Sequence, residues 1–123
     1  MSHRGDREFL LDILEACTRI SSFVKDMSSD DFVKDIKTQD ATLRNIEIIG
    51  EAVKGLSSEF TNKHTEIEWN KIAGMRDKLI HSYFGVNLEI VWDAVQNKIP
   101  ILRDSIPKFL QELEHGKQKN EMK

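Results

Sequence analysis

The chain has 123 residues, a length that suits one compact domain and is too short for two ordinary ones. Hydrophobic residues make up 39% of it and charged residues 32%, which is typical of a soluble globular protein with many exposed helix faces. No apolar run approaches the ~20 residues that span a membrane, and the N-terminus lacks the uncharged apolar core of a signal peptide. A formal net charge of −3 disfavours a broad nucleic-acid-binding surface but leaves room for local contact with a phosphate.

The first predicted helix covers residues 6–27, and a short turn of helix is predicted at 30–35 after the break in "SSDDF". One cysteine, Cys17, cannot form an internal disulfide, so a cytoplasmic location is the simplest reading. It lies in the apolar stripe of the first helix, which favours a small core residue over a nucleophile. That stripe, at steps of three and four residues, consists of Leu10, Ile13, Leu14, Cys17, Ile20, Val24 and Met27.

The second long helix is predicted over 39–57, with Thr38 as its N-cap. Gly50 falls at the edge of its apolar stripe, where the missing side chain permits another helix to approach closely. The segment "SSEFTNKH" that follows is read as a connection. The stripe itself consists of Leu43, Ile46, Ile49, Val53 and Leu56.

A third helix is predicted from about Glu66 to Tyr83, and Gly85 can supply the left-handed turn that ends it. Asn87 is the expected N-cap of a further helix over 88–98.

Pro100 suits the first turn of a last segment that ends near Glu114, and Pro107 can kink that segment. Four long amphipathic segments with short connections predict an all-α fold: an up-and-down antiparallel four-helix bundle with an extra short or kinked helix. We expect one helical domain over 1–116 and a polar C-terminal tail over 117–123.

One residue breaks the pattern of the third helix. Arg76 occupies a position of the apolar stripe where a hydrophobic side chain is expected. Because a buried unpaired arginine is very costly, its guanidinium must be paired, face a cleft or meet another chain. Such a breach of local pattern is typical of a functional site. The other members of the stripe are Trp69, Ile72, Ala73, Leu79, Ile80 and Tyr83.

Three polar neighbours accompany Arg76. Asp77 lies four residues before His81, so its carboxylate can hydrogen-bond the imidazole and fix its tautomer. Tyr83 returns to the stripe of Arg76, whereas His81 lies on another face of an ideal helix. Unwinding of the helix end, or a second subunit at a two-fold seam, would bring these edges together. The simpler alternative is that His81 only interacts with the helix dipole and that Tyr83 is a core or interface aromatic.

A charged line runs along the second helix, away from its core stripe. It consists of Arg44, Glu47 and Glu51, and Ile48 lies beside it. The line is either a solvated face with internal ion pairs or the lining of a dimer cleft. An isoleucine next to it modestly supports a contact surface.

No metal site or cofactor is predicted, because the histidines are scattered and no ligand spacing joins them. His64 is expected in a loop and His115 in the tail. Trp69 and Trp92 are read as core or interface anchors rather than as base-stacking platforms. The four histidines are His3, His64, His81 and His115.

Three blocks of the sequence carry a family resemblance. "RDKLIHSY" at 76–83 resembles the Arg–four residues–His–X–Tyr motif of the HepT-type HEPN proteins. "RNIEIIGEAVKGLS" at 44–57 is similar to their second long helix, and "VNLEIVWDAVQNKIP" at 86–100 to the segment after the motif. The similarity covers roughly 7–114.

This resemblance implies a small helical bundle that forms a homodimer, with the motifs of both subunits in one composite cleft. HepT-type members are metal-independent endoribonucleases and act as toxins of type VII-like toxin–antitoxin pairs. Carried over to this chain, the catalytic residues are Arg76 and His81, with Asp77 in support. The partner implied is an MntA-like minimal nucleotidyltransferase antitoxin, which transfers AMP to the motif tyrosine, here Tyr83, and so silences the toxin. The charged line of the second helix would contribute to the dimer cleft.

Two other functions stay open at this point. The chain would serve as a non-catalytic nucleotide- or substrate-binding subunit of a nucleotidyltransferase if Arg76 binds phosphate and His81 need not titrate. It would be a purely structural dimer if Arg76 affects assembly or stability alone.

Overall fold

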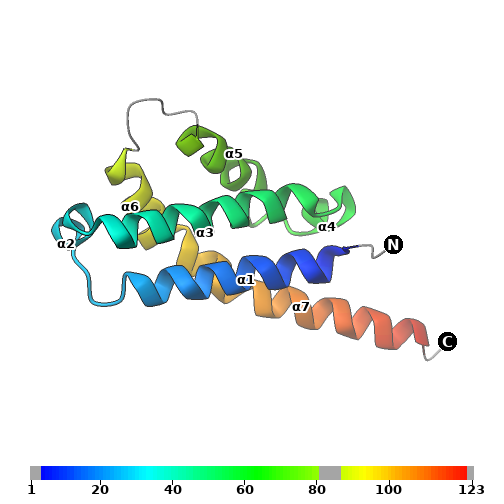
Figure 1. Cartoon of the computed structure of the whole chain (residues 1–123). Coiled ribbons are helices and arrows are strands. Elements are labelled where there is room, and N and C mark those ends of the chain that lie inside the picture. The colour runs from blue at the N-terminus through cyan, green and yellow to red at the C-terminus, as the bar shows by residue number, and fades with distance from the viewer. Residues whose placement is uncertain (1–3, 81–86, 122–123) are drawn as a thin grey trace.

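The computed structural model describes residues 4–80 and 87–121 of the chain. Over these ranges the regular structure is entirely helical, so the predicted all-α class is confirmed (Figure 1). The elements in chain order are α1 (Asp6–Phe23), α2 (Ser29–Lys34), α3 (Ile36–Gly55), α4 (Ser58–Lys63), α5 (Trp69–Ile80), α6 (Leu88–Asn97) and α7 (Ile99–Glu121).

The centre of the bundle is α1, which packs against both α3 and α7 and runs antiparallel to them (Figure 1). On its other side α3 packs against α5, and α6 packs against α7 and the short α2. The four longest elements are therefore the predicted antiparallel bundle, and α2, α4 and α6 are short additions to it. Their apolar stripes meet in one core, whose fully buried large side chains include Leu10, Ile13, Ile20, Phe32, Ile46, Ile49, Ile99, Leu102 and Ile106.

The predicted N-cap is confirmed for α6 and is wrong for α3. Asn87 caps α6 as predicted, because its side chain accepts hydrogen bonds from the N–H groups of Glu89 and Ile90. Thr38 is not the cap of α3. That helix begins at Ile36, and Asp35 is the N-cap, since its carboxylate accepts the Thr38 N–H at 3.0 Å.

The connection predicted at "SSEFTNKH" contains a helix, α4. Ser57 caps it by accepting the Phe60 N–H at 3.1 Å, and Phe60 is buried. Asp6 at the start of α1 accepts hydrogen bonds from both the N–H and the hydroxyl of Ser57, each at 2.7 Å. These bonds tie the start of α4 to the start of α1.

The predicted limits of the first and third helices differ from the structure. The first helix ends at Phe23 instead of 27, and Asp26 beyond it has φ 62°. The third begins at Trp69 instead of Glu66, because tight turns occupy the residues before it.

The last helix, α7, has Pro100 in its first turn as predicted and continues past Glu114 to Glu121. It remains helical through Pro107, which lies on its exposed side. The division into a domain over 1–116 and a tail over 117–123 stays a prediction.

Candidate functional site

The site begins with a close crossing of α5 over α3. A Cβ atom built on Gly50 would lie 2.5 Å from the Cβ of Arg76, so no larger residue fits there without a shift. The predicted close approach at this glycine is therefore confirmed. The crossing presses the aliphatic stem of Arg76 against the backbone of α3 and fixes where its guanidinium can reach.

The guanidinium of Arg76 has two carboxylate partners. Nη2 lies 3.1 Å from Oε1 of Glu51 on α3, and Nη1 lies 3.1 Å from Oδ1 of Asp77 on α5. The side chain is 27% exposed. Its Nε is buried and has no hydrogen-bond partner among the residues that the structure describes. A buried donor with no acceptor costs free energy, so we expect this nitrogen to bond a group outside the described residues.

Asp77 links this arginine to a lysine. Its Oδ1 also accepts a hydrogen bond from Nζ of Lys54 at 3.2 Å. The hydrogen bonds from Arg76 and Lys54 hold the pKa of Asp77 below its usual range. The sequence predicted that Asp77 would pair with His81. His81 lies outside the described residues, so that pairing stays a prediction, and the partners seen are Arg76 and Lys54.

An open cleft of about 500 Å³ lies in front of Arg76, between α1 and α3. It brings Arg76 together with the charged line that the sequence singled out on α3. The sequence alternative in which Arg76 is paired and also faces a cleft is thus the observed one. The residues that line this cleft, which we call the Arg76 cleft, are Arg4, Phe9, Asp12, Arg44, Glu47, Ile48, Glu51, Ala52 and Arg76.

Each arginine of the Arg76 cleft has an acidic neighbour. Arg44 lies 3.7 Å from Glu47 and is 72% exposed, which makes this a loose surface pair. Arg4 pairs with Asp12 of α1. The cleft therefore presents three guanidinium groups, the side chain best suited to bind phosphate with two donors.

Arg4 was not predicted from the sequence. It precedes the first helix, and only the folded chain brings it to α3, with its guanidinium 5.3 Å from the centre of the Phe9 ring. Its pairing with Asp12, eight residues away, spans more than two helical turns, beyond the spacing at which helix periodicity predicts pairs.

His81 and Tyr83 lie outside the residues that the structure describes. The predicted turn at Gly85 lies outside them too. The roles of these residues therefore stay predictions. What the described residues provide is the cationic half of the predicted site, positioned by a helix crossing.

Residues predicted to have no catalytic role fall into the core. Cys17 is fully buried, and burial raises the pKa of its thiol to about 12, so it is not a reactive thiolate. Trp69 is 6% exposed, and its Nε1 donates to the backbone oxygen of His64 at 2.9 Å. Trp92 is partly buried, with its ring 5.2 Å from that of Phe32. Both tryptophans are core anchors, as predicted.

None of the helices described is both long and apolar enough to cross a bilayer. Within the same ranges, no group of three or more His, Cys, Asp or Glu side chains gathers at metal-binding distance.

The chain is similar to known proteins over most of its length. The family described as "Ribonuclease HepT-like" matches residues 13–109. A Methanocaldococcus jannaschii protein whose name marks it as a candidate RNase is 47% identical over 114 residues, covering 93% of this chain and 94% of its own length. A similarly named protein from Caldanaerobacter subterraneus is 49% identical over 85% of this chain and 94% of its own. A Thermococcus cleftensis protein named "Probable ribonuclease HepT" is 44% identical over 86% and 96%. No solved structure gives a significant match.

Proposed function

Because this chain belongs to the HepT-like ribonuclease family, we propose that it is an endoribonuclease whose active site is built on Arg76. The observation that carries the proposal is the way in which the structure positions the side chain of Arg76. The α3–α5 crossing at Gly50 fixes its stem, the side chain lines the Arg76 cleft, and Glu51 and Asp77 hold its terminal nitrogens in place. Such a preorganised donor is suited to stabilise charge that develops on a phosphate.

The proposed reaction is attack by a ribose 2′-hydroxyl on the adjacent phosphorus. The O2′–P bond forms as the P–O5′ bond breaks, which leaves a 2′,3′-cyclic phosphate and a 5′-hydroxyl. His81 takes the 2′-hydroxyl proton or gives one to the leaving oxygen, since imidazole exchanges protons near neutral pH. Arg76 binds the non-bridging oxygens and stabilises the phosphorane. No step requires a metal ion.

Two copies of the chain are proposed to share this site. A second His81 from a two-fold related copy allows one imidazole to act as base and the other as acid. The Arg76 cleft supports such an assembly, because its rim combines the exposed Arg44 with the partly buried Ile48 and Phe9. Arg44, Glu47 and Glu51 would then line the seam between the copies.

Regulation is proposed to act at Tyr83. A nucleotidyltransferase of the MntA type, acting as antitoxin to this toxin, would add AMP to the tyrosine hydroxyl. The new phosphate would carry negative charge next to Arg76 and occupy the guanidinium that the substrate needs. Intact mass and cleavage of RNA by AMP-modified and bare protein test this directly: equal rates would contradict it.

The experiment that tests the function itself is cleavage of total cellular RNA by purified protein in the presence of EDTA. The unmodified chain should release fragments with cyclic-phosphate and 5′-hydroxyl ends, and His81→Ala and Arg76→Ala should not. Arg19→Ala is the matched control, because Arg19 is an exposed arginine of α1 paired with Glu15, away from the cleft. Absence of cleavage by the unmodified chain, with Tyr83 shown to be bare, would favour the nucleotide-binding subunit instead.

A further inference from the structure

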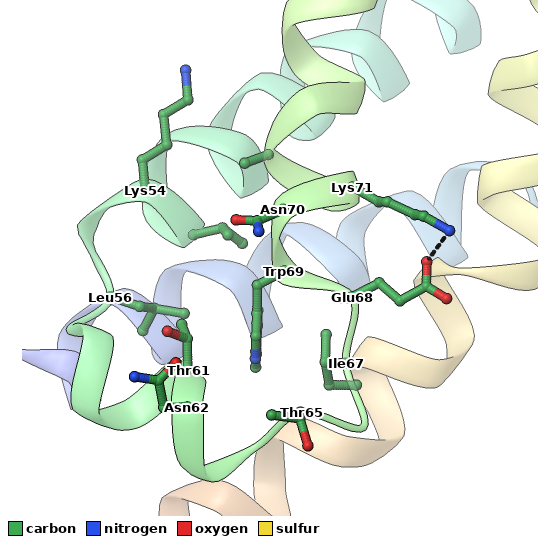
Figure 2. A pocket seen from close by; sticks show the side chains of 12 residues that line it. Lys54, Leu56, Thr61, Asn62, Thr65, Ile67, Glu68, Trp69, Asn70 and Lys71 are labelled. Carbon is green, nitrogen blue, oxygen red and sulfur yellow. Dashed lines mark ion pairs between the residues drawn. The ribbon is translucent and has the colours of Figure 1, made fainter.

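A second pocket shares no lining residue with the Arg76 cleft and has a different chemistry. It has a volume of about 530 Å³ and opens between the end of α3, the short α4 and the start of α5. Figure 2 shows it from close by, with Trp69 at its centre and the side chains of α4 facing those of α5 across it. We call it the α4–α5 pocket. Its size is within the range of small-molecule sites.

The floor of the α4–α5 pocket is apolar and its rim is polar. Buried or partly buried carbon surface comes from Val53, Leu56, Ile67, Trp69 and Ala73. The rim carries two amides and two hydroxyls, from Asn62, Asn70, Thr61 and Thr65. A flat partner with an apolar face and a polar edge fits this arrangement.

The two rim amides are available to a ligand. Asn62 and Asn70 are exposed, and neither side chain makes a hydrogen bond within the described part of the chain. An amide offers both a donor and an acceptor, which is how asparagine reads the edge of a nucleobase. The one acid of the lining, Glu68, is already paired with Lys71 at 2.9 Å (Figure 2). The rim is therefore not set up to bind a free cation.

The pocket is connected to the proposed catalytic arginine. Lys54 lines it, and the Nζ of Lys54 bonds the same Asp77 oxygen that bonds Arg76. Lys54 follows Gly50 by four residues, one turn or about 6 Å along α3. A strand with one phosphate at Arg76 can therefore pass Lys54 and place a neighbouring base at the α4–α5 pocket.

We propose that the α4–α5 pocket binds the base of an RNA nucleotide next to the cleaved phosphate. Asn62 and Asn70 select the base through its hydrogen-bonding edge, and Lys54 contacts the linking phosphate. Sequence-specific RNA recognition targets unpaired bases in this way. This inference rests on the ribonuclease function proposed above and adds a source of sequence preference to it.

A binding assay tests the pocket without any need for cleavage. In a Trp92→Phe variant, Trp69 is the only tryptophan of the chain, and it reports on the pocket floor. The four nucleoside 5′-monophosphates are titrated, with excitation at the red edge where bases do not absorb. We expect quenching with a preference of about 10-fold for one base, lost in the Asn62→Ala/Asn70→Ala double variant. Gln96→Ala, an exposed amide of α6, is the matched control.

A cleavage assay tests the link to the site. Ends are mapped on a random-sequence RNA, and the double variant should lose the preference at one flanking position, whereas the Gln96→Ala control should keep it. No quenching by any nucleotide at millimolar concentration, with cleavage intact and its preference unchanged in the variant, would overturn the subsite and leave the ribonuclease. Base-selective quenching without cleavage of any RNA would retain a nucleotide site and overturn the ribonuclease.

Discussion

Arg76 on α5 and His64 at the end of α4 offer a direct comparison. Each is a nitrogen-bearing side chain packed against the core and flanked by two carboxylates. The side chain of Arg76 is 27% exposed and that of His64 is 13% exposed. By residue type and acidic neighbours alone, either would qualify as a candidate site.

Their surroundings separate them. The ring of His64 packs against two aromatic rings, 4.5 Å from Phe60 and 4.3 Å from Phe109, and its backbone oxygen accepts the Trp69 indole N–H. Arg76 lines an open cleft, and its Nε has no hydrogen-bond partner among the described residues. Close packing against these two rings makes His64 part of the contact between α4 and α7. An open edge makes Arg76 available to a ligand. The open edge, rather than the presence of acids, is what marks a site here.

Removal of an aromatic neighbour of His64 should have the largest effect on stability. Phe109 is 4% exposed and contacts the rings of Phe60, His64 and Trp69. Phe109→Ala should lower the free energy of unfolding by about 3–5 kcal/mol, since it leaves a cavity in this cluster. Urea unfolding measures the loss, with the exposed neighbour Lys108→Ala as control. A loss no greater than that of the control would show that the cluster is not a structural joint.

Arg76→Ala should have the opposite profile. We expect RNA cleavage to fall by about 10²–10³-fold, the usual effect of removing one preorganised donor. Stability should change little, because Glu51 is 60% exposed and Asp77 keeps its hydrogen bond from Lys54. His64→Ala is the comparison variant and should lose stability but keep its cleavage rate per folded molecule. If both variants lost stability and cleavage rate to the same extent, Arg76 and His64 would not differ in their roles.

Gly50→Ala should displace Arg76, because the added methyl group would collide with its side chain. The added Cβ would lie 2.5 Å from the Arg76 Cβ, so the two helices must separate. We expect a cost of about 1–3 kcal/mol in unfolding free energy and cleavage lower by about 10- to 100-fold.

Gly74→Ala on α5 is a matched control for that variant, because a Cβ there meets nothing within 4 Å. It should raise stability by up to about 1 kcal/mol through helix propensity and leave cleavage unchanged. If Gly50→Ala behaves as this control does, the crossing does not position Arg76.

The local parts of this architecture could be predicted from the sequence. The stripe of α1, the cap at Asn87, the close approach at Gly50 and the anomalous Arg76 all follow from periodicity within one helix. The cap of α3 was predicted wrongly as Thr38, because threonine and aspartate, the residue type of the true cap Asp35, both accept the N–H bonds of a first helical turn.

Other features depend on contacts between elements and leave no local signal. The six-residue α4 is too short to show a period. The Lys54–Asp77 bond joins α3 to α5, and the burial of His64 depends on Phe109 from α7. His81 and Tyr83 were found only through the family motif, and their geometry stays a prediction.

Glu51→Gln should make Arg76 more available to a phosphate, because it removes a competing carboxylate. Glu51 bonds Nη2 of Arg76, the same nitrogen that a phosphate would use. We expect RNA carrying a 2′-deoxy nucleotide at the cleaved position to bind several-fold more tightly, with a steeper dependence of affinity on salt. Glu47→Gln is the control, because Glu47 pairs with Arg44 instead. Weaker binding in the Glu51 variant would mean that this acid positions the arginine rather than competing for it.

The smallest predicted effect is on the pH dependence of stability, through the hydrogen bonds that Arg76 and Lys54 donate to Asp77. Hydrogen bonds from Arg76 and then Lys54 hold the pKa of Asp77 below its unfolded value of about 3.9. A lowered pKa in the folded chain contributes stability that is fully present above the unfolded pKa. That contribution disappears as the pH falls through the folded pKa.

Asp77→Asn should therefore lower the urea midpoint slightly at about pH 6 and have less effect at about pH 3. Lys54→Ala should remove part of the same difference, because it deletes one of the two donors. An equal effect of Asp77→Asn at both pH values would show that its ionised form does not stabilise the α3–α5 crossing. The pairing of Asp77 with His81 would then be the better account of its role.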